Sequence, residues 1–377
     1  MNKKEIAEIK KQLSKKNDTF SRITGCYVSA DKKKITEFSS SFQSLEEEER
    51  FKYFDIFKKT LSGGLGKNLA YMDFPDEAEE DRGGQELLYR LVKSRLEEKR
   101  FLDDLYGRVI EHYESAKNYL ILLVYNDYDV PGKGKDGIEM EDGSENVFSY
   151  IQMAICPVDL SEPGLSFDRK EMEFHNRIRD WVVGKPQAGF LFPAFDDRAA
   201  DIHHVLYYSK DAKDLHPAFT EGVLGCRPPM PAEEQKNAFQ SVVEEALGDG
   251  CSFEAVRNIH DSLRQIQKEA VMAESPDPVK IGKADLRNIL EESGAEPEGM
   301  ENYERAFEEK TEDAGEFMAS NVMEGKKFEL RTPDVTVSVN PDRTDLVETR
   351  IIDGRKCIVI PVSGPLQVSG ITVRAKK

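Results

Sequence analysis

An apolar run in the first third of the chain, NYLILLVYNDYDV (118–130), determines how the surrounding residues can fold. Its uninterrupted core, residues 119–125, is far shorter than the roughly 20 residues that a membrane-spanning helix needs. An apolar run of this length between polar flanks is typical of a strand that is buried on both faces. We therefore expect an interior strand of a mixed sheet here.

Helices and a hairpin are predicted before this strand. Apolar spacings of three and four indicate a short amphipathic helix over 3–13, and a polar turn at 30–32 joins two β-rich runs. Ser44 and Glu47 have the spacing of a capping box that opens a helix ending before Ser62. A second helix is expected over 85–113, because its leucines fall largely on one face.

The residues after the strand are predicted to return to the sheet. Residues 131–146 are rich in glycine and acidic side chains and are expected to form a loop, followed by short apolar blocks over 147–210. Trp181, the single tryptophan, lies beside Ile178 and Val182 and is expected in the core. Residues 1–225 are therefore interpreted as one mixed α/β region.

Two further regions differ from the first in pattern and in charge. Residues 226–325 are predicted to be helical in about four segments, and 276–325 contain 14 acidic and 5 basic residues. Residues 326–377 are β-rich with 10 basic and 6 acidic residues, and Asp353-Gly354 indicates a hairpin. The predicted fold class is α+β in three parts: a mixed α/β N-terminal region, an acidic helical middle and a small C-terminal β module.

Charge and cysteine spacing limit the possible partners. The formal net charge of −18 repels phosphate backbones, so no DNA partner is expected. The five cysteines contain no CxxC pair, so neither a zinc ribbon nor a disulfide framework is predicted. The N-terminal residues lack the apolar core of a signal peptide. We expect a cytoplasmic protein with no cofactor and no membrane contact.

A four-residue segment is the first candidate catalytic site. Arg82-Gly83-Gly84-Gln85 resembles the GGQ loop of archaeal and eukaryotic peptide chain release factors. That resemblance implies a backbone of Arg82, Gly83 and Gly84 that binds at the ribosomal peptidyl centre, and a Gln85 that positions the hydrolytic water. The acidic segment DFPDEAEED (73–81) precedes the motif and opposes contact with tRNA. The alternative is a glycine turn that opens a helix.

Aspartates and histidines between 192 and 205 are the second candidate, a metal site. Asp196, Asp201 and His203 have oxygen and nitrogen ligands suited to a hard or borderline metal ion. Asp197 and His204 lie among them, but adjacent histidines on a strand point to opposite faces. The alternative is a polar turn with local pairing.

Several segments carry a family resemblance over nearly the whole chain. They are FKYFDIFKKTLSG (51–63), RIRDWVVG (177–184), GFLFPAFDDR (189–198), HHVLYYSKD (203–211) and VNPDRTDLVET (339–349). The chain resembles an uncharacterised domain-of-unknown-function family of Gram-positive anaerobic bacteria, which implies a bacterial cytoplasmic protein. We expect a non-enzymatic interaction module with an unknown protein partner. The alternatives are a ribosome-associated peptidyl-tRNA hydrolase or rescue factor and, third, a metal-dependent enzyme.

Overall fold

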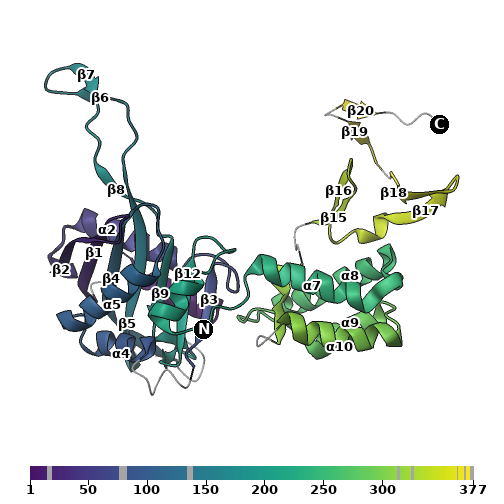
Figure 1. Cartoon of the computed structure of the whole chain (residues 1–377), viewed down its shortest axis with the longest axis horizontal. Coiled ribbons are helices and arrows are strands. Elements are labelled where there is room, and N and C mark those ends of the chain that lie inside the picture. The colour runs from purple at the N-terminus through teal and green to yellow at the C-terminus, as the bar shows by residue number, and fades with distance from the viewer. Residues whose placement is uncertain are drawn as a thin grey trace. The chain divides into compact units, whose positions relative to one another are not determined.

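The computed structural model of the chain (Figure 1) describes residues 1–14, 19–75, 83–133, 139–311, 315–323, 327–362, 364–368 and 371–373. Contacts divide it into two compact units, each described by itself below. Unit 1 consists of Met1–Glu234 and Pro276–Pro278, and unit 2 of Gln235–Ser275 and Val279–Lys377. The division into three regions that the sequence suggests stays a prediction. Helices and strands are both abundant, which confirms the α+β class.

Unit 1 is built on a sheet of eight strands. Its order is β2-β1-β4-β5-β9-β12-β3, with β8 also paired to β5. The helices are α1 (Lys3–Gln12), α2 (Glu47–Thr60), α4 (Gly84–Lys93), α5 (Lys99–His112) and α6 (Pro217–Phe219). The strands are β1 (Phe20–Val28), β2 (Lys34–Ser41), β3 (Leu69–Asp73), β4 (Asn118–Lys133), β5 (Glu139–Leu160), β6 (Leu165–Asp168), β7 (Glu173–Asn176), β8 (Trp181–Val183), β9 (Ala188–Phe192), β10 (Ala194–Asp196), β11 (Ala199–Asp201) and β12 (His204–Ser209).

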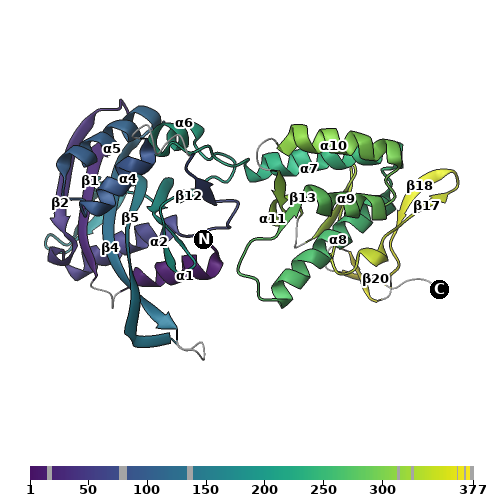
Figure 2. The same ribbon diagram turned by 90° about the horizontal axis from the view of Figure 1, so that it is seen from below.

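The apolar run at 118–130 forms β4, an interior strand as predicted, between β1 and β5. Ile121 and Leu123 pack in one core with α4 and α5, whereas Leu122 and Val124 pack in the other with α1 and α2. Figure 2 shows these helix pairs on opposite faces of the sheet. Burial of each of these side chains stabilises the folded state by roughly 1.5–3 kcal/mol.

The expectation of a mixed sheet was wrong, because every strand pairing described within this sheet is antiparallel. An uninterrupted apolar strand indicates that both faces are covered, and helices can cover both faces of an antiparallel sheet too. The predicted loop at 131–146 was also partly wrong: β4 runs to Lys133 and β5 begins at Glu139. Residues 134–138 lie outside the described residues.

Two helix predictions need correction. Ser44 does not cap α2; its hydroxyl donates to the Ser41 carbonyl at 2.7 Å, and Glu46 precedes the first helical residue. The helix predicted over 85–113 is two helices. Arg95 and Leu96 take the left-handed conformation, with φ of 53° and 58°, and end α4. The turn buries Leu96 in the core beside both helices.

In the described residues, unit 2 contains four principal helices around one core, which matches the about four helical segments expected over 226–325. The helices are α7 (Ala232–Leu247), α8 (Phe253–Met272), α9 (Lys283–Glu292), α10 (Pro297–Thr311) and the short α11 (Ala319–Val322). β13 (Lys280–Gly282) pairs antiparallel with β14 (Glu316–Met318), with α9 and α10 between them in sequence, so the expectation that this region is wholly helical was wrong. The remaining strands pair as the hairpins β15 (Phe328–Arg331) with β16 (Thr336–Val339), β17 (Glu348–Ile352) with β18 (Arg355–Val359), and β19 (Leu366–Val368) with β20 (Ile371–Val373). The hairpin predicted at Asp353-Gly354 is present, and these two residues form the turn between β17 and β18.

The β-rich tail contacts the helices of unit 2 at its first hairpin. The Phe328 ring packs edge-on against His260 of α8, with centroids 4.8 Å apart. Asp342 accepts hydrogen bonds from the Arg264 guanidinium of α8 at 3.1 and 2.8 Å. No helix in the described parts of the chain combines the length and the apolar character that crossing a membrane requires.

Candidate functional site

The glycine segment that resembles a release-factor loop is packed against the protein where the structure describes it. Gly84 begins α4, and a Cβ atom on it would lie 2.2 Å from the Leu224 carbonyl oxygen. Gln85 is only 6% exposed, and its Nε2 donates to the Ile202 carbonyl at 3.0 Å. Arg82 lies outside the described residues, and Gly83 precedes the helix. Gly84 and Gln85 therefore lack the exposure that a projecting catalytic loop requires, and their hydrolytic role stays a prediction.

The aspartates and histidines proposed as metal ligands belong to two separate groups of polar contacts, one at Asp196 and one at Asp201. Asp196 pairs with the Met1 amino group at 2.5 Å. Asp201 contacts the Tyr71 hydroxyl at 3.0 Å and His204 Nδ1 at 2.5 Å. His203 is exposed, and its backbone N–H donates to Asp201 at 3.0 Å.

These contacts tie three strands together. His204 Nε2 lies 2.9 Å from Asp73, and its ring stacks on Tyr71 with centroids 4.5 Å apart. Burial would raise the pKa of the Asp201 carboxyl, but hydrogen bonds from the His203 N–H and Tyr71 outweigh it and lower the pKa. Among the described residues, no group of three or more His, Cys, Asp or Glu side chains could hold a metal ion. The metal role of Asp196, Asp201 and His203 stays a prediction.

A two-stranded ribbon projects from the sheet of unit 1 (Figure 1). We call residues 158–183 the arm. At its base β5 pairs with β8, so that Leu160 lies opposite Trp181. At its far end β6 pairs with β7, and Arg177 N–H donates to the Gly164 carbonyl at 2.9 Å between the two pairings. The arm is thus a hydrogen-bonded extension of the central sheet.

The far end of the arm exposes a row of apolar side chains. Leu165, Phe167 and Phe174 share one face, since Phe167 lies directly opposite Phe174 and Leu165 is two residues away. Leu165 is 75% exposed and Phe174 is 70% exposed, and the ring centroids of Phe167 and Phe174 are 5.0 Å apart. No residue of the arm beyond Val158 belongs to the described cores of unit 1.

The expectation that Trp181 lies in the core was wrong. Trp181 is 58% exposed and Ile178 is 82% exposed, both on the arm. The short apolar block around Trp181 correctly indicates extended structure. It does not show whether another layer covers the apolar face, because that depends on distant parts of the chain.

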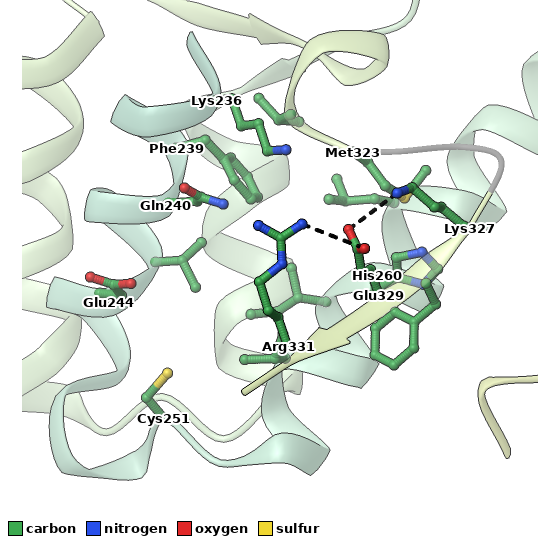
Figure 3. Close-up of a pocket in the computed structure, with 16 residues that line it drawn as sticks. Lys236, Phe239, Gln240, Glu244, Cys251, His260, Met323, Lys327, Glu329 and Arg331 are labelled. Carbon is green, nitrogen blue, oxygen red and sulfur yellow. Dashed lines mark hydrogen bonds and ion pairs between the residues drawn. The ribbon is translucent and has the colours of Figure 1, made fainter. Parts of the chain in front are cut away.

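Unit 2 contains a pocket of about 520 Å³ between α7, α8 and β15 (Figure 3). Its apolar lining includes Phe239, Val243, Ile259, Leu263, Val322, Met323 and Phe328. Three charged side chains of the lining form one group, in which Glu329 pairs with Lys327 at 3.2 Å and with Arg331 at 3.6 Å. Figure 3 shows the Arg331 guanidinium beside Glu329, with Glu244 on the other side of the pocket from Lys327.

Two further side chains of the pocket bear on its chemistry. His260 Nε2 is buried and has no hydrogen-bond partner among the residues that the structure describes. Burial raises the pKa of the Cys251 thiol, and the nearby Glu244 raises it further, so Cys251 is a poor nucleophile. The pocket therefore has the features of a binding site. No local motif marks Arg331 or His260, because the lining comes from elements far apart in the sequence.

Comparison with known proteins places the whole chain in one group. A family model described as Domain of unknown function (DUF4317) matches residues 1–371. No curated protein and no solved structure matches the chain. The predicted resemblance to an uncharacterised family is confirmed.

Proposed function

The chain belongs to the uncharacterised family Domain of unknown function (DUF4317), and from its geometry we propose a non-enzymatic, cytoplasmic interaction module that binds another protein through the arm. The carrying observation is the exposed apolar face formed by Leu165, Phe167 and Phe174. Exposed apolar clusters of this kind commonly mark binding surfaces in soluble proteins.

The arm has the structure of an element that a partner stabilises. A two-stranded ribbon with no third strand and no covering layer is marginally stable in water. The exposed side chains include two aromatic rings and the tryptophan, residue types that supply much of the binding energy at interfaces. Covering them would remove apolar area from water.

The charges of the arm favour a protein partner over nucleic acid or a membrane. Residues 158–183 contain six acidic and four basic residues, a net charge of −2. That charge repels both phosphate backbones and anionic lipid surfaces. The turn at the tip, residues 168–171, consists of four charged side chains and would resist insertion into lipid. The net charge of −18 disfavours a second copy of the chain as the partner.

Affinity capture with paired variants tests this proposal. Phe167→Ser combined with Phe174→Ser removes the aromatic pair without touching either core. The matched control combines Ile351→Ser with Ile371→Ser, which are 74% and 71% exposed on the tail. From native-cell extract, including ribosome fractions, we expect the wild type and the control to retain the same stable partner. Loss of two interface hot spots should weaken that capture by at least about 30-fold in the arm variant.

Equal recovery of the partner by the arm variant and the wild type would show that the arm is not the binding surface. Absence of any partner in extracts and ribosome fractions would also count against the proposal. A mass corresponding to a homodimer in light scattering would contradict the assignment of a different protein as the partner.

The enzymatic alternatives make opposite predictions. A release-factor-like hydrolase requires ribosome co-sedimentation and loss of peptidyl-tRNA hydrolysis in Gln85→Ala. A metal-dependent enzyme requires stoichiometric metal that His203→Ala removes. The burial of Gln85 and the pairing of Asp201 with Tyr71 and His204 support the interaction module over both.

A further inference from the structure

We propose that the pocket of unit 2 binds a small amphipathic carboxylate, an acid with an aliphatic or aromatic body and one negative charge. Its volume of about 520 Å³ lies within the range of roughly 300–1,000 Å³ that is typical of small-molecule sites. Every described residue that lines it belongs to unit 2.

The apolar part of the lining is suited to the body of such a ligand. Phe239 and Val243 of α7 and Ile259 and Leu263 of α8 all line the pocket, and all four belong to the core of unit 2. Because these side chains are packed in the core, the apolar surface is held in place before a ligand arrives. A preformed apolar surface reduces the ordering cost of binding.

The charged part of the lining is suited to one carboxylate. Among the described residues that line the pocket, three side chains are basic (Lys236, Lys327 and Arg331) and two are acidic (Glu244 and Glu329), a sum of +1. A single negative charge balances that excess, whereas a phosphate dianion exceeds it. A local cationic excess also attracts anions.

Arg331 is the side chain that we expect to bind the carboxylate. Its contact with Glu329 spans 3.6 Å, which is longer than a hydrogen bond, and its side chain is 73% exposed. The planar guanidinium can therefore turn its parallel N–H donors to a ligand at the mouth of the pocket. Arginine binds carboxylates in this bidentate way more specifically than lysine does.

His260 provides a second polar contact. Its ring packs against Phe328, while its Nε2 is buried without a partner among the described residues. The Nδ1 of the same ring lies 3.3 Å from an Asp261 carboxylate oxygen, which can only accept, so in the neutral ring Nε2 is the acceptor. A buried acceptor left unpaired is unfavourable, so a ligand hydroxyl or amide N–H that donates to it would offset part of that cost. The same atom would favour a ligand with a polar group over a pure hydrocarbon.

Calorimetric titration with decanoate, below its micelle concentration, tests the proposal on the full chain. Decanamide is the matched neutral probe, and inorganic phosphate is the probe for anion binding alone. We expect decanoate to bind at one site per chain, decanamide at least 10-fold more weakly, and phosphate without detectable heat.

Three variants assign that binding to the pocket. Arg331→Gln should weaken decanoate at least 10-fold, and Gln240→Trp, an exposed change at the pocket edge, should block it. Arg350→Gln on β17 is the control, since Arg350 is 62% exposed and does not line the pocket. Its affinity for decanoate should be within 2-fold of that of the wild type. Decanoate should also slow the alkylation of Cys251.

The proposal is overturned if decanoate does not bind at millimolar concentration. It is equally overturned if decanamide binds as tightly as decanoate, or if Arg331→Gln retains wild-type affinity. None of these results depends on the arm or its partner, so failure here leaves the interaction proposal intact.

Discussion

At the scale of single residues, two helical glycines have opposite roles. Gly84 is buried at the start of α4, where an added Cβ would meet the Leu224 carbonyl oxygen at 2.2 Å. Gly107 lies inside α5, where an added Cβ would have no neighbour within 4 Å. The first glycine permits close packing between backbones, whereas the second only lowers helix stability.

Alanine at these two positions should therefore change stability in opposite directions. Gly84→Ala should destabilise the protein by about 1–3 kcal/mol, because the clash is with backbone that cannot move aside. Gly107→Ala should stabilise it by about 0.5–1 kcal/mol through helix propensity. Urea unfolding followed by circular dichroism measures both. If Gly84→Ala left the free energy of unfolding unchanged, the contact with Leu224 would not be tight in solution.

At the scale of elements, the local patterns in the sequence predict most of what the structure contains. The hairpin between β1 and β2, the interior strand β4, the four principal helices of unit 2 and the hairpin at Asp353-Gly354 all follow from short-range signals. The break after α4 does not, because Leu96 is buried only through the packing of α4 and α5 in one core.

The candidate sites were harder to predict than the elements. The GGQ segment and the Asp-His cluster are conspicuous in sequence, yet Gln85 and Asp201 are engaged in internal hydrogen bonds. Trp181 of the arm was expected in the core, because a short apolar block indicates a strand but does not show whether another layer covers it. The pocket has no sequence signal, since Arg331 and His260 meet only through folding.

The docking of the tail onto α8 should depend on pH. The hydrogen bonds from Arg264 and then Lys268 lower the pKa of the Asp342 carboxyl to about 2. A carboxyl whose pKa is lower in the folded state stabilises the fold above its unfolded value near 4 and loses that contribution as pH falls toward 2. Asp342→Asn should therefore have a lower Tm than the wild type at pH 5 and an equal Tm at pH 2.

Calorimetric scans at the two pH values measure this difference. Arg355→Gln, a charge change on the neighbouring hairpin, is the control and should leave the pH dependence unchanged. If the difference in Tm between the wild type and Asp342→Asn were as large at pH 2 as at pH 5, the ion pair would not be its cause.

At the scale of the whole molecule, the two units have separate hydrophobic cores. The clusters on the two faces of the sheet belong to unit 1, and the cluster among α7 to α10 belongs to unit 2. Leu88 in α4 and Leu290 in α9 are each fully buried in their own core. We therefore expect two unfolding transitions.

Matched truncations in the two cores test this independence. Leu88→Ala should lower the Tm of the unit 1 transition alone, and Leu290→Ala that of the unit 2 transition alone. Each substitution should reduce the free energy of unfolding of its unit by roughly 2–5 kcal/mol. Differential scanning calorimetry resolves the two transitions. If either substitution shifted both transitions together, the chain would unfold as one cooperative body.

The central claim is that the exposed face of the arm binds a protein, and photocrosslinking in the native cell tests it most directly. A photoreactive phenylalanine analogue at Phe174 reports what contacts that face, and the same analogue at Ile351, which is 74% exposed on the tail, is the control. We predict one discrete crosslinked protein from position 174 that is absent from position 351. No adduct from position 174, or the same adducts from both positions, would contradict the claim.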